Sequence, residues 1–164
     1  MPEGSQSKVF EFLDSLAIEY SVQSHRAVFT IEDMESLEME HIDRVAKNLF
    51  VRDDKKEHYY LVVIAKDKTA NLKDLQHKIG SRRLSFASEN DLDKYLGLKK
   101  GEVSPFGALN DEANAVKIII DEDLAGYEFI GVHPNDNTAT VWISAGNLVA
   151  ALGCIGHKAS YMRL

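Results

Sequence analysis

Two adjacent polar residues interrupt a stretch that otherwise has the pattern of a buried strand. In RVAKNLFVRD, residues 44–53, Lys47 and Asn48 lie between the apolar pair VA and the apolar triplet LFV. Burying an ammonium group without a partner costs on the order of several kcal/mol. Lys47 is therefore either an edge-strand residue that points to water or a charge directed into a cleft.

Two further stretches combine polar residues with turn formers. In EVSPFGA, Pro105 removes a backbone N–H, and Gly107 allows the backbone to approach another group closely. In GVHPNDNTAT, a strand breaks at His133 and returns through a turn rich in Asn and Asp. The pattern alone also fits a plain surface turn in the first stretch and a structural histidine in the second.

Other kinds of chemistry find little support. The six histidines have no spacing that would place two on one helix face as metal ligands, and Cys154 is the single cysteine. A nucleophile pair of Cys154 and His157 is conceivable, but a single cysteine near an apolar helix usually serves packing. Glycine-rich phosphate loops and nucleophile elbows are absent. We therefore expect no metal, no disulfide and no cofactor.

The charge distribution limits the choice of partners. The formal net charge of −7 argues mildly against nucleic acid, yet Lys66–Lys100 holds nine Lys/Arg and five Asp/Glu, a local balance of +4. An acidic protein with one basic segment can still bind one end of an RNA. The polar start and the absence of a long apolar run predict a cytoplasmic protein that does not enter a membrane.

The periodicity predicts an α/β or α+β domain around a mixed sheet, with residues 1–164 forming a single domain. Helices are expected where apolar residues recur at helical spacing or where cap residues begin and end a segment, at 7–17, 30–37, 71–80, 88–97 and 144–153. Strands are expected where apolar residues alternate or run together, at 18–24, 45–52, 58–65, 114–121, 127–132 and 138–144.

Three motifs occur together in a known order. VAKNLFVRD, SPFG and GVHPNDNTATVWIS, preceded by SHRAVFTIEDM, resemble the ProX branch of the YbaK/ProX aminoacyl-tRNA editing domains. The resemblance extends from Val9 to about Arg163. The pattern departs from the family before Ser104, where Gly101 is followed by Glu and Val.

The resemblance implies a barrel-like mixed sheet surrounded by helices, and a free-standing deacylase that hydrolyses alanine from mischarged proline tRNA. A synthetase pocket built for proline cannot exclude the smaller alanine strongly, so a second pocket completes a double sieve. The partner implied is the aminoacylated acceptor end of tRNA(Pro), with prolyl-tRNA synthetase as a further candidate partner. Two alternatives stay open: a Cys-tRNA(Pro) deacylase of the same superfamily, and a non-catalytic module that binds tRNA or the synthetase.

The resemblance also implies the residues of the site. Lys47 holds the ester end of the substrate, and backbone N–H groups around Gly107 stabilise the oxyanion. Both Lys47 and Asn48 must then face inward, which predicts a bulge at 47–48. The substrate-binding residues expected are Asn48, Ser104, Phe106 and His133. The size sieve is expected from Ile18, Tyr20, Val22, Val28 and Phe29. Candidate tRNA contacts in the basic segment are Lys66, Lys68, Lys73, Lys78, Arg82, Arg83, Lys99 and Lys100.

Overall fold

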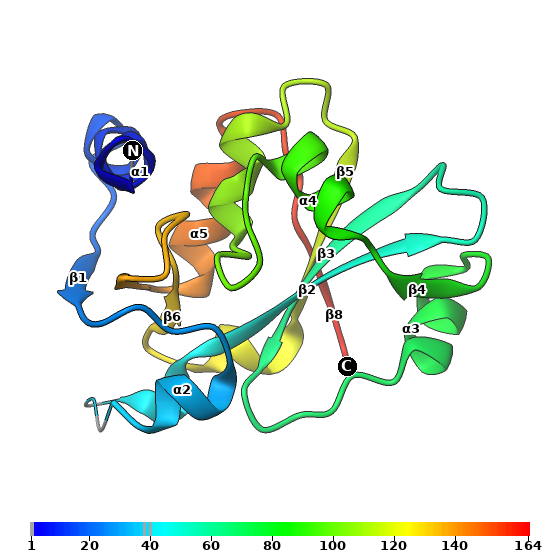
Figure 1. Ribbon diagram of the computed structural model, residues 1–164, viewed down its shortest axis with the longest axis horizontal. Coiled ribbons are helices and arrows are strands. Elements are labelled where there is room, and N and C mark those ends of the chain that lie inside the picture. The colour runs from blue at the N-terminus through cyan, green and yellow to red at the C-terminus, as the bar shows by residue number, and fades with distance from the viewer. Residues whose placement is uncertain (1, 38, 40) are drawn as a thin grey trace.

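The computed structural model describes residues 2–37, 39 and 41–164, and Figure 1 shows how its helices and strands are arranged. The α-helices are α1 (Pro2–Ser15), α2 (Ile31–Glu35), α3 (Leu72–Ile79), α4 (Glu89–Leu96) and α5 (Ala145–Gly153). The strands are β1 (Ser21–Ser24), β2 (Ala46–Asp53), β3 (Tyr59–Ala65), β4 (Leu84–Phe86), β5 (Val116–Asp121), β6 (Ile130–Val132), β7 (Ala139–Ile143) and β8 (Ser160–Met162). Short 3-10 helices are η1 (Ile42–Arg44), η2 (Pro105–Asn110) and η3 (Glu122–Gly126).

Side-chain caps explain where several helices begin. The Thr30 hydroxyl accepts a hydrogen bond from the Asp33 N–H at the start of α2, as the sequence predicts. Asn71 accepts from two backbone N–H groups at the start of α3. Ser88 and Asp91 form a reciprocal capping box on α4. These caps satisfy donors that the first helical turn otherwise leaves without partners.

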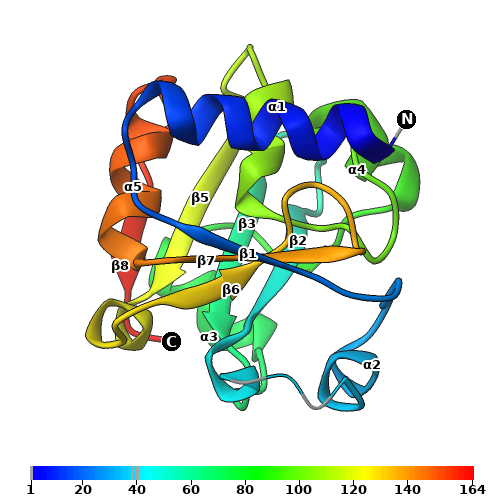
Figure 2. The same ribbon diagram turned by 90° about the vertical axis from the view of Figure 1, so that its left-hand side faces the viewer.

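The strands form two sheets. A three-stranded antiparallel sheet has the order β1-β7-β6, and a five-stranded mixed sheet has the order β4-β2-β3-β5-β8. A parallel bridge between Val45 and Gly131 connects β2 to β6 and so joins the two sheets. Figure 2 shows the three-stranded sheet running across the five-stranded one, with α1 along one end. The α+β class and the mixed sheet with surrounding helices are as predicted.

The helices cover three apolar clusters. The largest cluster packs α1, α4 and α5 against β3 and β5, with Leu13, Leu96 and Leu148 fully buried in it. On the other face of the five-stranded sheet, α3 buries Leu75 against β3 and β5. A third cluster packs Met34 of α2 against Val45, Trp142 and their neighbours. The last cluster fixes α2 beside the point where the two sheets meet.

The strand predictions are correct in number for the six strong patterns but too long at several ends. The first strand was expected over 18–24, whereas β1 begins only at Ser21, because a turn follows α1 and Ala17 takes a left-handed conformation with φ 54°. The short strands β4 and β8 were not predicted. Three residues carry too little alternation to reveal a strand that pairs only at its sheet's edge.

Candidate functional site

A small pocket of about 210 Å³ opens where the two sheets meet. Its walls come from β2, from β6 and β7, from the segment leading into α2, and from the loop before η2. The residues on which the following argument depends are Val28, Phe29, Lys47, Asn48, Gly101 and His133, and all of them line it. We call it the β2-edge pocket.

The pocket exists because β2 lacks a neighbour along half of one edge. β4 pairs with β2 only at Val51–Asp53, whereas β3 pairs with its other edge from Ala46 to Arg52. The Ala87 N–H donates to the Phe50 carbonyl on the β4 side at 2.9 Å. Because backbone groups alternate along an antiparallel strand, the N–H and C=O of Asn48 point to this same side. They therefore face the pocket beyond the end of β4.

The predicted bulge at 47–48 is wrong. The pairing of β2 with β3 runs in unbroken register from Ala46 opposite Ala65 to Arg52 opposite Tyr59. Lys47 and Asn48 therefore have side chains on opposite faces of the sheet. Because the unpaired edge already exposes backbone groups to the pocket, no bulge is needed for this part of β2 to form its wall.

Asn48 contributes an unsatisfied polar atom. Its Oδ1 is buried and has no hydrogen-bond partner within the described residues. A buried acceptor without a donor is costly, on the order of 1–3 kcal/mol, so such an atom commonly marks a place where a ligand or water donates a hydrogen bond. The Asn48 Oδ1 is therefore available to accept an N–H or O–H group from a bound molecule or a water.

Lys47 is half-buried beside the pocket and does not extend into bulk water. Its ammonium donates a hydrogen bond to the carbonyl of Lys68, in the segment that follows β3. A lysine ammonium has three donors, so this contact leaves others for a substrate. The contact holds the ammonium at the Lys68 carbonyl without neutralising its charge, since a carbonyl is uncharged.

His133 closes the pocket from the end of β6. Its Nδ1–H donates to the carbonyl of Ala139 at 3.0 Å, which leaves the Nε2 lone pair as an acceptor. Burial lowers the pKa of His133 below its usual 6.5, and the nearby His25, whose ring centroid is 6.2 Å away, lowers it further. The ring is thus neutral near pH 7.

The loop before η2 differs from what the sequence predicts. Phe106 and Gly107 are buried in the main core and do not line the pocket. The Phe106 N–H donates to the Ser104 hydroxyl at 3.1 Å, and the Gly107 N–H donates to the Ser104 carbonyl at 3.0 Å. The prediction that these groups stabilise an oxyanion is therefore wrong, because both donors are already used. Gly107 is small for another reason: a Cβ there would lie 3.0 Å from atoms of Leu96 and Leu98.

Ser104 braces the site rather than lining it. Its hydroxyl donates to the backbone carbonyl of His133 at 2.5 Å, and Asn135 donates from Nδ2 to the Phe106 carbonyl at 3.0 Å. These two bonds tie the turn after β6 to η2 and fix where His133 lies. The part of the loop that does reach the pocket is Gly101 and Val103. The pattern of residues gave no indication of which end of this loop faces inward.

Only part of the predicted sieve lies at the pocket. Val28, 1% exposed, and Phe29, 61% exposed, line its inside and its mouth. Ile18, Tyr20 and Val22 do not line it. Ile18 and Tyr20 pack against the main core, the Tyr20 hydroxyl donates to Asp14 at 2.9 Å, and Val22 is 42% exposed. Apolar lining residues that the sequence did not single out are Ile31, Met34, Val45 and Val132.

His25 and Thr140 form a polar pair that sequence reasoning also missed. Thr140 lines the pocket, and its Oγ1 lies 2.9 Å from His25 Nε2. His25 Nδ1 lies 2.7 Å from the Arg26 carbonyl, so it carries the proton, and Nε2 accepts from the threonine hydroxyl. The pair supports the His133 side of the pocket. Nothing in the sequence pattern links residues so far apart.

Within residues 2–37, 39 and 41–164, there is no group of three or more His, Cys, Asp or Glu side chains arranged to hold a metal ion. The same residues contain no helix long and apolar enough to cross a membrane. The polar residues that line the β2-edge pocket are Thr30, Lys47, Asn48, His133 and Thr140.

A polar site at the junction of two sheets, built on this α+β fold, has a counterpart among known proteins. The family model described as "Aminoacyl-tRNA editing domain" matches residues 25–151. This match includes the pocket residues from Val28 to Thr140. The chain belongs to the aminoacyl-tRNA editing domain family.

Individual relatives agree with this family. "Prolyl-tRNA editing protein ProX" of Acetoanaerobium sticklandii is 50% identical over 148 residues, covering 90% of this chain and 90% of the relative. "Prolyl-tRNA synthetase associated domain-containing protein 1" of Mus musculus is 35% identical, covering 88% of each. A solved structure described as a candidate trans-editing enzyme for prolyl tRNA synthetase has a TM-score of 0.74 at 19% identity, covering 98% of this chain and 97% of that one. At that identity the structural likeness shows a shared fold.

Proposed function

We propose that this protein is a trans-acting aminoacyl-tRNA deacylase that hydrolyses the ester of mischarged Ala-tRNA(Pro). The observation that carries the proposal is the β2-edge pocket, where Lys47, Asn48 and His133 lie around a volume of about 210 Å³. Membership of the aminoacyl-tRNA editing family and the 50% identity to a protein named for prolyl-tRNA editing support the same activity.

The chemistry required is modest, because an aminoacyl ester is already activated. A water molecule attacks the carbonyl carbon, the ester C–O bond breaks, and the terminal ribose oxygen leaves and takes up a proton. The protein has to position the ester, polarise its carbonyl and orient the water. Among the pocket residues, no side-chain nucleophile is needed for this route. A hydroxyl of the terminal ribose assisting the water makes the reaction partly substrate-assisted.

The pocket groups divide these tasks by their chemistry. The Lys47 ammonium supplies positive charge for the carbonyl oxygen as negative charge develops on it. The unsatisfied Asn48 Oδ1 accepts from the amino group of the alanyl moiety. The neutral His133 positions the substrate through Nε2, with Nδ1 held by the Ala139 carbonyl. Oxyanion donors from the η2 backbone are not part of this scheme, since those N–H groups are already used.

The selectivity we propose is a size sieve that admits alanine and rejects proline. The apolar part of the pocket, including Val28, Met34 and Val132, sets its depth. One methylene more or less in such a pocket is worth about 1–3 kcal/mol, or roughly 10- to 200-fold in rate ratio. Cys-tRNA(Pro) is the second candidate substrate, because a cysteinyl group is only slightly larger than an alanyl group.

Single-turnover hydrolysis of Ala-, Cys- and Pro-tRNA(Pro) tests the proposal. We expect release of alanine to be fastest and release of proline to be the slowest. Fastest release of cysteine would assign the chain to the sister activity. Hydrolysis no faster than that of the uncatalysed ester, combined with tight tRNA binding, would identify a non-catalytic binding module.

Shortening Val28 tests the sieve directly. Val28→Ala enlarges the pocket from inside, so hydrolysis of Pro-tRNA(Pro) should rise by about 10-fold relative to Ala-tRNA(Pro). Ile18→Ala removes a comparable apolar side chain outside the pocket and serves as the matched control. Equal selectivity in the two variants would place the sieve elsewhere.

The wider context follows from this activity. We infer a single editing domain over residues 1–164, a cytoplasmic location, and the acceptor end of tRNA(Pro) as the partner. Prolyl-tRNA synthetase is a further candidate partner, because the related mouse protein is named for association with it. A synthetase that presents the tRNA would relieve this acidic protein of binding the whole RNA by itself.

A further inference from the structure

A second and larger depression lies on the α3 side of the five-stranded sheet. It has a volume of about 850 Å³ and shares no lining residue with the β2-edge pocket. Tyr60 of β3, Ile119 of β5 and Met162 of β8 line it, and the end of α3 borders it. We call it the α3 groove.

Cations from three distant parts of the sequence gather at this groove. Lys78 comes from α3, Lys117 from β5 and Lys158 from the segment before β8. All three side chains are exposed, and none has an ion pair within the described part of the chain. The Lys78 ammonium donates to the backbone carbonyl of Arg163 at 2.6 Å, which fixes its position and leaves its charge uncompensated.

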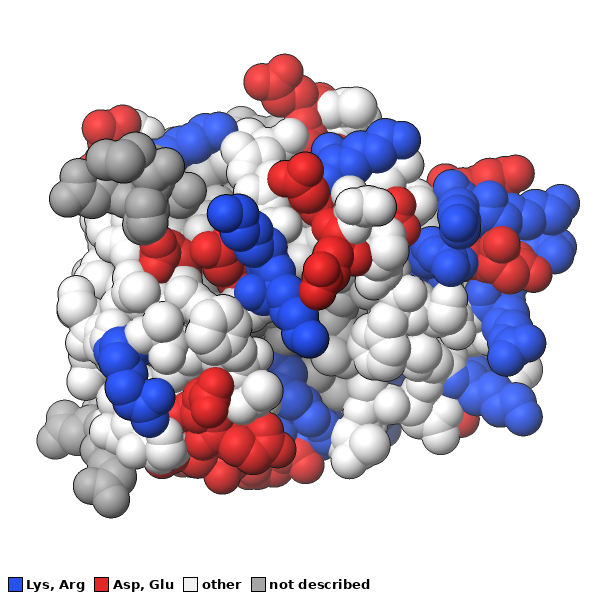
Figure 3. Space-filling view, in the orientation of Figure 1, with Lys and Arg blue, Asp and Glu red and all other residues white. Residues whose placement is uncertain are grey.

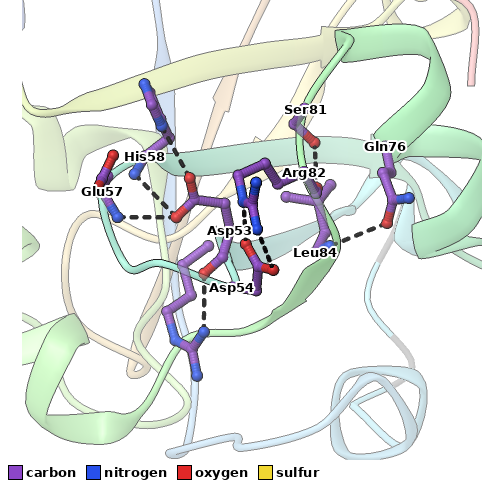
Figure 4. Close-up of polar contacts among 9 residues, drawn as sticks. Asp53, Asp54, Glu57, His58, Gln76, Ser81, Arg82 and Leu84 are labelled. Carbon is purple, nitrogen blue, oxygen red and sulfur yellow. Dashed lines mark hydrogen bonds and ion pairs between the residues drawn. The ribbon is translucent and has the colours of Figure 1, made fainter.

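The acidic groups at the groove and beside it already have partners. Figure 4 shows Arg82 bonded through two nitrogens to Asp54, at 2.6 and 3.0 Å. The same view shows the Asp53 carboxylate held by His58 and by backbone N–H groups. Figure 3 shows Lys and Arg side chains concentrated at the end of the molecule that carries α3 and β4. The groove therefore has a positive balance on a protein whose net charge is −7.

The wall of the groove also contains a polar atom without a partner. His157 is 3% exposed, and its Nε2 lies 3.0 Å from the Asp111 carboxylate. Its Nδ1 is buried and has no hydrogen-bond partner within the described residues. Asp111 in turn accepts from the backbone N–H groups of Ala115 and Val116. This buried imidazole is therefore held firmly in the wall of the groove, with one acceptor nitrogen left without a partner among the described residues.

Part of the basic segment predicted from the sequence is engaged in ion pairs away from the groove. Lys66 pairs with Glu35 at 3.0 Å, and Lys68 pairs with Asp121 at 2.9 Å. Lys78 does reach the groove, but its two partners Lys117 and Lys158 lie outside that segment. Folding thus builds a positive surface that the local charge balance along the chain does not reveal.

We propose that the α3 groove binds the phosphodiester backbone of the tRNA whose aminoacylated end occupies the β2-edge pocket. This rests on the proposed function. Both sites touch β2, the pocket at Asn48 and the groove at Asp53. Five residues of strand separate them, or about 17 Å at ~3.3 Å per residue. About five stacked nucleotides at ~3.4 Å per step cover that length, so one RNA can reach both.

Binding of uncharged tRNA(Pro) at several salt concentrations tests the groove independently of catalysis. The variant Lys117→Gln/Lys158→Gln removes two exposed charges from it. The control Lys8→Gln/Lys94→Gln removes two exposed charges on α1 and α4, so both variants have the same net charge. We expect the groove variant to raise the Kd about 10-fold. The slope of log K against log salt should fall by about 1.4–1.8, the value for two lost phosphate contacts, whereas the control changes little.

A minimal substrate separates this proposal from the proposed function. Alanyl-adenosine ester carries no phosphodiester backbone, so the groove variant should hydrolyse it at the wild-type rate. If neither the wild type nor the variants hydrolysed this ester, while the groove variant still bound tRNA more weakly than the control, the deacylase assignment would be overturned. The proposal that the groove binds tRNA would then still hold. Equal tRNA binding by the groove and control variants would overturn the groove. A groove variant that binds inorganic phosphate more weakly but binds tRNA as the wild type does would also contradict the proposal, since the groove would then be a site for small anions.

Discussion

The two halves of β2 belong to one continuous strand but differ in what lies beside their outer edge. In the second half, Val51–Asp53 pairs with β4, and the Asp53 carboxylate is fully hydrogen-bonded. In the first half, β4 no longer pairs with β2, and Asn48 keeps a buried oxygen with no partner among the residues that the structure describes. The same backbone geometry therefore gives a closed, satisfied edge at one end and an open, unsatisfied edge at the other.

This difference separates stability from function along a single strand. Satisfied buried polar groups rigidify a fold, because losing one partner leaves the other desolvated and unpaired. Unsatisfied groups cost stability in the free protein and are useful only when a ligand completes them. We therefore expect changes at Asp53 to act on folding and changes at Lys47 to act on the reaction.

The largest expected effect is on catalysis at the open half. Lys47→Ala should lower single-turnover deacylation of Ala-tRNA(Pro) by about 100-fold, comparable to the loss of one preorganised charge-stabilising group. The melting temperature should change little, because the ammonium contacts a single carbonyl and no carboxylate. Lys55→Ala, on the exposed turn between β2 and β3, provides the control. A Lys47 variant that unfolds but has normal activity per folded molecule would show that the open half of β2 serves stability and not the reaction.

The next effect is on stability at the closed half. Asp53 is 1% exposed and accepts from the N–H groups of Glu57 and His58 at 2.8 and 3.3 Å, and from the His58 ring at 2.9 Å. Asp53→Asn weakens these bonds, so the free energy of unfolding should fall by about 1–3 kcal/mol. Hydrolysis of alanyl-adenosine ester per folded molecule should stay the same. Urea unfolding of both forms measures the first quantity, and a large loss of turnover would show that the two halves are not separate.

The pH dependence sharpens this prediction. Burial alone raises the pKa of Asp53, but the His58 side chain and the backbone N–H groups outweigh it and lower the pKa below its usual value. A carboxylate with a lowered folded-state pKa stabilises the fold above its unfolded pKa of about 3.9, and the gain disappears as pH falls through the folded value. The stability difference between wild type and Asp53→Asn should therefore shrink below about pH 4.

Local features were the part of this molecule that the sequence predicted well. Thr30, Asn71 and Ser88 cap the helices expected to follow them, because capping depends on a few neighbouring residues. The apolar pattern likewise located β2 and β3 to within one residue or so. The open edge of β2 was not predictable in this way. It depends on where β4 stops pairing, and β4 has only three residues.

The errors at the site share one physical cause. Alternation along a strand shows which face a side chain occupies but not which edge of the strand is free. The sequence therefore required a bulge to turn both Lys47 and Asn48 inward, whereas the structure keeps them on opposite faces and exposes this part of β2 through its unpaired edge. Similarly, the Ser-Pro-Phe-Gly turn suggested backbone N–H groups free to stabilise an oxyanion. In the structure the N–H groups of Phe106 and Gly107 donate to Ser104. Long-range pairing decides both cases.

The smallest expected effect concerns His133, which faces the open half of β2 from across the pocket. Its Nδ1–H is bound to the Ala139 carbonyl, so its Nε2 can accept a hydrogen bond from the substrate while the ring stays neutral. His133→Ala should lower deacylation by about 10-fold, and His133→Gln should recover part of this, because an amide can still donate and accept. A general base would not be rescued by Gln, and a mere brace would lower the melting temperature of both variants.

The acid side of the pH–rate profile distinguishes a His133 that positions the substrate from one that only forms a wall of the pocket. Burial lowers the pKa of His133 below 6.5, so in the folded protein protonation occurs only at more acidic pH. Protonation removes the Nε2 acceptor, and it also favours the unfolded chain, which binds the proton more readily between the folded pKa and 6.5. Wild-type stability should decline as pH falls below about 6.5, and deacylation should decline at more acidic pH, where the ring of the folded protein becomes protonated. His133→Gln should show a flatter profile for each. An identical acid decline in the Gln variant would assign the titration to another group and leave His133 as a neutral wall of the pocket.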